Sequence, residues 1–210
     1  MSLKRVIHDI RVELKAKDRV REEVLAVSRE IVRLSSEAIL STHRNDYAGA
    51  KRRLVQIKKK IDRMDKLLQG WPEIAHSGAV YAAYQEFAEA ALLLNFIAED
   101  KFPSPEELGI PSIPYVLGLA DMVGELRRKA LDSIRVGDLK TAEKCLVVME
   151  DVQNLLMTLE HAHVIAKGLR RKIDVARKLI EETRGDVTTE ARRSLLEKSI
   201  KKLEKTVWRG

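Results

Sequence analysis

Residues 20–40 of the chain read VREEVLAVSREIVRLSSEAIL, and their apolar positions recur at steps of three and four. The stripe comprises Val20, Val24, Val27, Ile31, Leu34 and Ala38. Because an α-helix has about 3.6 residues per turn, this spacing places all of these side chains on one face. The stretch therefore predicts a long amphipathic helix, which begins near the N-terminus and ends around THRND, residues 42–46.

Helix signals continue through the first half of the chain. Asp46 can cap a second helix at residues 47–69, because a carboxylate at this position accepts bonds from the first free N–H groups. The QGWP sequence then breaks the chain, and Pro72 suits the first turn of a third helix that ends near Asp100. FPSPEELGIPSIP, residues 102–114, is rich in proline and predicts a linker that holds one short helical turn.

The second half of the chain also predicts helices. One helix begins at Pro114 and ends before Asp138, which can cap the next helix, running to about residue 160. A further apolar stripe leads to RGDVTT, residues 184–189, whose two threonines can cap a last helix. Since no strand alternation appears, we predict a single all-α domain over residues 1–210, a bundle of six or seven helices.

The composition indicates which partners and compartments suit the chain. Its 210 residues include 45% hydrophobic and 34% charged residues but only 4% aromatics, which is typical of long helices. A single Cys145 excludes an internal disulfide and favours a reducing compartment, the cytoplasm. No apolar run serves as a signal peptide or membrane helix. The net charge of +7 favours anionic partners, nucleic acid before membranes.

Two pairs of acids interrupt apolar helices. Residues 79–98, AVYAAYQEFAEAALLLNFIA, carry only two charges, Glu86 and Glu89, which share a helix face with Cβ atoms about 5–6 Å apart. Asp121 and Glu125 form a similar pair in the next long helix, a natural antiparallel neighbour. Gly118 and Gly124 of that helix, with the alanines, would let the two helices approach closely. If the pairs converge, the buried charges must be protonated, paired or bound to a cation. Their oxygen ligands suit Mg²⁺ or Mn²⁺, which can activate water for phosphodiester hydrolysis.

Other interpretations of these acids stay open. Each pair can instead lie on the solvated side of an amphipathic helix, where glutamate is common. All-α, Mg²⁺-dependent nucleotide pyrophosphohydrolases also clamp their cation between helices. Glu160 and His163 form one E-x-x-H, but a di-iron oxidase needs two such motifs, and the chain holds one.

Basic residues gather on the first two helices around their apolar stripes. The candidates for contact with RNA phosphates are Arg19, Arg21, Arg29, Arg33, Lys51 and Lys58. With so few aromatics, binding would depend on phosphate contacts more than on base stacking. The alternative is that many of these side chains form only a solvated surface.

The chain resembles the translin family over most of its length. The resemblance is carried by REEVLAVSREIVRLSSEAILSTHRND at 21–46, YQEFAEA at 84–90 and PYVLGLADMVGELRRKALDSIRVGD at 114–138. The family, which contains translin and translin-associated factor X (Trax), implies an all-α fold, RNA as partner and an octameric shell. Resemblance to the Trax branch implies a metal-dependent endoribonuclease, and its motifs place the acids on Glu86, Glu89 and Asp121, with Glu125 beside them.

The chain departs from the animal Trax pattern in two places. It lacks a basic N-terminal extension and a long acidic insert between the third and fourth helices. These differences favour a compact microbial version that assembles from identical subunits. Two classes of function follow: an Mg²⁺-dependent or Mn²⁺-dependent endoribonuclease, and a shell that binds single-stranded RNA, short duplex RNA or single-stranded DNA without chemistry.

Overall fold

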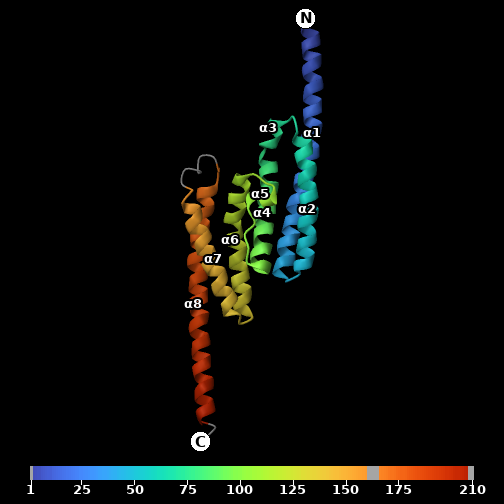
Figure 1. Cartoon of the computed structure of the whole chain (residues 1–210). Coiled ribbons are helices and arrows are strands. Elements are labelled where there is room, and N and C mark those ends of the chain that lie inside the picture. Colours follow the sequence, from blue (N-terminus) through green and yellow to red (C-terminus); the bar gives the residue numbers. More distant parts are fainter. Residues whose placement is uncertain (1, 160–165, 208–210) are drawn as a thin grey trace. The chain divides into compact units, whose positions relative to one another are not determined.

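The computed structural model describes residues 2–159 and 166–207, and these form eight α-helices (Figure 1). The helices are α1 Leu3–His43, α2 Tyr47–Leu68, α3 Pro72–Ala75, α4 Gly78–Glu99, α5 Pro105–Leu108, α6 Ser112–Arg135, α7 Leu139–Met157 and α8 Leu169–Val207. Within these ranges there is no β-strand, so the predicted all-α fold is confirmed. No helix in the described part of the chain is both long and apolar enough to cross a membrane.

The chain divides into two compact units, Met1–Gly118 and Leu119–Gly210. The division falls inside α6, so this helix contributes its first residues to one unit and the rest to the other. A single domain over residues 1–210 stays a prediction.

In the first unit, α1 packs against α2 and α4. The predicted stripe of α1 is buried from Val24 to Ala38, whereas Val20 is only partly covered. Helix α4 is buried on most of its circumference, including every residue from Phe87 to Leu94. The apolar character of residues 79–98 is thus explained, because this helix supplies the centre of the core.

The ends of the first helices follow local sequence signals. The Asp46 carboxylate accepts a bond from the Gly49 N–H at 2.9 Å, and α2 begins at the next residue, as predicted. Gly70 has a positive φ of 82°, the conformation that suits glycine where the chain leaves α2. The linker holds the one short turn predicted, α5, with a complete capping box between Ser104 and Glu107.

The predicted third helix is wrong in one respect, because it consists of two separate helices. Helix α3 is a single turn that ends at Ala75, and α4 begins at Gly78. Between them Ser77 has an extended backbone, with φ −72° and ψ 150°, which a continuous helix cannot contain.

In the second unit, α7 packs against α8. Asp138 caps α7 as predicted, accepting a bond from the Thr141 N–H at 3.1 Å. The predicted break at residues 184–189 is wrong, since α8 runs through it without interruption. The Thr189 hydroxyl donates to the Gly185 carbonyl one turn earlier, at 2.9 Å, and so does not cap a new helix. The described residues form eight helices, whereas six or seven were predicted. The single-turn helices α3 and α5 increase the number, and α8 reduces it because it replaces two predicted helices.

Candidate functional site

The acid pair of the first unit lies on α4. Glu86 is half-buried and Glu89 is buried, with 9% of its surface exposed. The neighbours of Glu89 along the helix, Ala88 and Ala90, are fully covered. Glu89 therefore does not belong to a solvated stripe, and its side chain is largely removed from water.

Gly118 brings the start of α6 directly against the α4 backbone beside this pair. A Cβ atom at Gly118 would lie 2.5 Å from the Gln85 carbonyl oxygen and 3.0 Å from the Glu89 backbone nitrogen. Glycine is therefore the residue that this close approach admits, as the sequence predicts. Gly124 belongs to the second unit, where a Cβ atom at its position would lie 4.0 Å from a Leu179 methyl group of α8.

The acid pair of the second unit begins at Asp121, three residues after Gly118. Asp121 and Glu125 follow Gly118 at helical spacings of three and seven, so all three lie on the same side of α6. Asp121 is half-buried, and its Oδ1 atom lies 2.5 Å from the Lys172 ammonium of α8. Glu125 lies 3.8 Å from the Arg128 guanidinium on its own helix.

A cavity of about 450 Å³ opens beside Asp121 within the second unit. Its lining comprises Ala120, Asp121, Gly124, Gly168, Arg171, Lys172, Val175, Ala176 and Leu179. We call it the Asp121 cavity. Lys172 was not a candidate from the sequence, although one signal was available: it precedes Ala176 by four residues and therefore shares the face of a predicted buried position.

The residues fit a hard divalent cation by the chemistry of their donors. Glu86, Glu89, Asp121 and Glu125 offer carboxylate oxygens, the ligands that Mg²⁺ and Mn²⁺ prefer. Two of these acids belong to each unit, and among the described residues no group of three or more His, Cys, Asp or Glu side chains is placed to hold a metal ion. The E-x-x-H pair, Glu160 and His163, lies outside the described residues.

The cysteine does not provide a nucleophile. Cys145 is buried in α7, and burial raises the pKa of its thiol to about 11. The thiol is therefore protonated near neutral pH, and a packing role fits it better than catalysis.

Four of the six basic candidates lie on α1 and are exposed. Arg21 binds Asp18 at 3.0 Å and Glu22 at 2.7 Å on its own helix. Arg33 forms a similar pair with Glu37, one turn further along the helix. Arg19 and Arg29 are exposed as well. All four can reach solvent, as phosphate contact requires.

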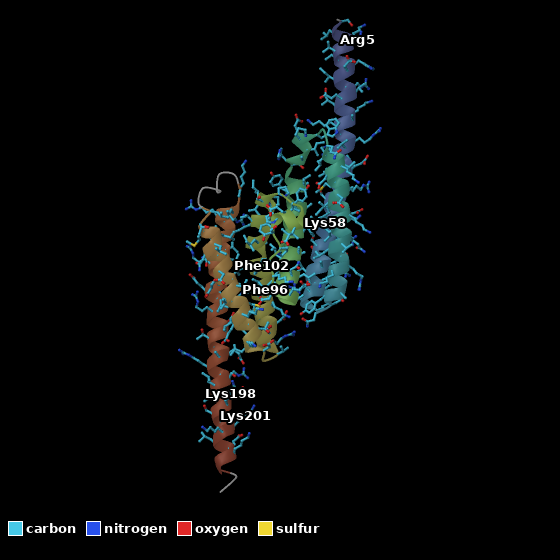
Figure 2. All side chains as sticks on the ribbon, in the orientation of Figure 1. Arg5, Lys58, Phe96, Phe102, Lys198 and Lys201 are labelled. Carbon is cyan, nitrogen blue, oxygen red and sulfur yellow. The ribbon has the colours of Figure 1, made fainter. Side chains whose placement is uncertain are left out.

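The two candidates on α2 differ from those on α1. Lys51 binds Glu99 of α4 at 2.6 Å, and this contact lowers the pKa of the glutamate. Lys58, labelled in Figure 2, donates to the carbonyl oxygens of Glu107 and Leu108 at 3.2 and 2.7 Å. Lys58 thus satisfies the carbonyl groups at the end of α5, a structural role that the sequence did not reveal.

The sequence is similar to a known protein family and to other proteins, and these similarities agree with the all-α architecture. The model of the Translin family matches residues 19–209. The uncharacterized protein MJ0175 of Methanocaldococcus jannaschii is 37% identical over 190 residues, which is 90% of this chain and 84% of that protein.

Solved structures are similar along nearly the whole chain. AfC3PO is 33% identical, with a TM-score of 0.83, over 90% of this chain and 98% of that one. The complex of AfC3PO with duplex RNA is 32% identical, with the same score and coverage. Apo-NeC3PO, 24% identical with a TM-score of 0.80 over 88% and 96% of the two chains, supports the fold alone. The family model matches most of the chain, and a relative that is 37% identical covers 90% of it. The chain therefore belongs to the Translin family.

Proposed function

We propose that the protein is a divalent-cation-dependent endoribonuclease in which Glu86, Glu89 and Asp121 are the catalytic acids. The observation that carries this proposal is the burial of Glu89 on an apolar helix. A buried carboxylate is costly unless it is protonated, paired or bound to a cation, and a cation site is one reason to retain it. The similarity to a protein solved with duplex RNA supports RNA as the substrate class.

Glu86, Glu89 and Asp121 would hold Mg²⁺ or Mn²⁺, with Glu125 as a fourth ligand or as a side chain that orients the others. The bound cation would supply Lewis-acid activation of a water molecule and of a phosphate oxygen. The carboxylates would set the position of the cation, and without the cation their negative charges would repel RNA. Hydrolysis then breaks a P–O bond of the chain, and water provides both the hydroxyl group on phosphorus and the proton of the leaving alcohol.

Cleavage assays with defined cations test this function. Single-stranded RNA, duplex RNA, single-stranded DNA and a nucleoside triphosphate are each incubated with Mg²⁺, with Mn²⁺ and with a chelator. We expect internal cleavage of RNA with either cation and none with the chelator. Release of pyrophosphate from the triphosphate, with RNA left intact, would instead identify a nucleotide pyrophosphohydrolase.

RNA binding, measured in the same series, should depend strongly on salt. The exposed arginines of α1 offer phosphate contacts, and each contact releases counterions. We expect the logarithm of the association constant to fall steeply and linearly as the logarithm of the salt concentration rises. Arg29→Ala should reduce the slope by about 0.7–0.9, the value for one phosphate contact. A flat salt dependence would contradict phosphate-based binding.

A second candidate function is a translin-like protein that binds RNA or single-stranded DNA without cleaving it. The ion pair between Asp121 and Lys172 favours this alternative, because one of the three acids is neutralised by a side chain of the protein itself. Salt-dependent RNA binding without cleavage in any cation would establish it.

We also propose that the chain assembles into a closed homo-oligomer, an octamer. Large apolar side chains are exposed along the first turns of α1, at Leu3, Ile7, Ile10 and Leu14, and along the last turns of α8, at Leu196, Ile200 and Leu203. Exposed apolar stripes of this kind mark interaction surfaces. Light scattering should give a mass near eight chains, and a monomer at micromolar concentration would contradict the proposal.

A further inference from the structure

The charged side chains of the Asp121 cavity carry a net positive charge. Asp121 contributes one negative charge, and Arg171 and Lys172 contribute two positive charges. Both basic residues lie in the first turn of α8, which begins at Leu169. The positive end of the helix dipole adds to their charge there, so the cavity suits an anionic group.

In the structure, the Lys172 ammonium in this cavity is paired with the Asp121 carboxylate. The ammonium lies 2.5 Å from the carboxylate oxygen, and the side chains are 28% and 25% exposed. A lysine ammonium is a compact charge on a flexible stem, so it can exchange one anionic partner for another without movement of the helix. Arg171 lines the same cavity.

A cation on Asp121 would change the balance of charge around Lys172. The cation and the ammonium compete for the same carboxylate, and their like charges repel each other. The ammonium then needs another anion within reach of its stem. In an RNA complex the anion available beside the cation is a phosphate of the RNA chain, and lysine is a common phosphate ligand.

We infer that Lys172 is a phosphate-binding residue of the nuclease site, which binds Asp121 in the cation-free protein and an RNA phosphate once Asp121 holds the cation. This inference rests on the proposed function, since it assigns a further residue to the same site. It makes Lys172 both a competitor of the cation and a ligand of the substrate.

Cation binding tests the first part of the inference without any need for turnover. Mn²⁺ is titrated calorimetrically into the full-length protein and into Lys172→Met, which keeps the apolar stem but lacks the ammonium. Removal of the competing charge should tighten Mn²⁺ binding about two- to fivefold, given the usual strength of such pairs. The control is Lys178→Met, an exposed position of the same helix outside the cavity, which should bind Mn²⁺ as the wild type does.

Steady-state cleavage of a short RNA tests the second part. Lys172→Met should lower kcat/KM about tenfold, with most of the loss in KM, because a bond to a charged phosphate disappears. Lys172→Arg retains a cation that binds phosphate and should stay within about threefold of the wild type. Circular dichroism before each assay verifies that the variants are folded.

The outcomes separate this inference from the proposed function. If the wild type binds no Mn²⁺ and cleaves no RNA, the proposed function fails and Lys172 is only the ion-pair partner of Asp121. If the wild type does both, and Lys172→Met equals it in Mn²⁺ affinity and in kcat/KM, the inference alone is overturned. Tighter Mn²⁺ binding with unchanged kcat/KM would overturn the phosphate contact.

Discussion

Glu89→Gln is expected to bind RNA at least as tightly as the wild type and to cleave it at least about 100-fold more slowly. The substitution keeps the volume of a buried side chain on α4 and removes its charge. Loss of a residue that merely orients a metal ligand costs about 10- to 100-fold, so loss of a ligand should cost no less. RNA affinity should persist because it depends on basic side chains elsewhere. Single-turnover cleavage and binding in a chelator measure the two quantities separately.

Glu86→Gln and Asp121→Asn should behave in the same way. Glu99→Gln is the matched control, because Glu99 is an acid of the same helix α4 that binds Lys51 and lies at the helix end. The control should cleave RNA at the wild-type rate. If all three acid variants also cleave at that rate, the site is misplaced.

Gly118→Ala is expected to lower the free energy of unfolding by about 1–3 kcal/mol, the usual cost of overpacking. The new Cβ would lie 2.5 Å from the Gln85 carbonyl oxygen and 2.8 Å from the Ala88 Cβ. The first of these is a backbone atom and cannot rotate away, so a helix must shift. For a chain of this length each kcal/mol corresponds to about 2–4 °C in the melting temperature, which thermal unfolding detects.

Gly185→Ala is the matched control for that experiment. Gly185 is also a helical glycine, but a Cβ there would meet no atom within 4 Å. Alanine should stabilise the protein at this position by up to about 1 kcal/mol, because it has the higher helix propensity. Equal melting temperatures for the two alanine variants would show that the close approach at Gly118 has no energetic weight.

Local patterns in the sequence were sufficient for most of the fold. The stripe from Val24 to Ala38 is buried as its period indicates, and the caps at Asp46 and Asp138 start their helices where predicted. These features depend on residues within one or two turns, which a single sequence displays directly. The glycine at position 118 belongs to the same class, because small residues indicate close helix contact.

The errors arise where local signals conflict or where distant segments meet. The RGDVTT sequence contains good capping residues, but within α8 the Thr189 hydroxyl bonds to its own helix. The roles of Lys58 and Lys172 depend on partners about 50 residues away, at Leu108 and Asp121, and no spacing rule connects them. That Glu86, Glu89 and Asp121 act together as catalytic acids is a prediction from the sequence motifs.

The continuity of α8 also has a mechanical consequence. Lys172 and Leu203 are 31 positions apart on one helix, which corresponds to about 46 Å at 1.5 Å per residue. A turn at residues 184–189 would have absorbed a displacement of the C-terminal end. Without that turn the helix acts as a rod, and rigid elements of this kind transmit movement between distant points. A neighbouring molecule that pushed the exposed leucine at its far end along the axis would move the lysine by the same amount and change its distance from Asp121.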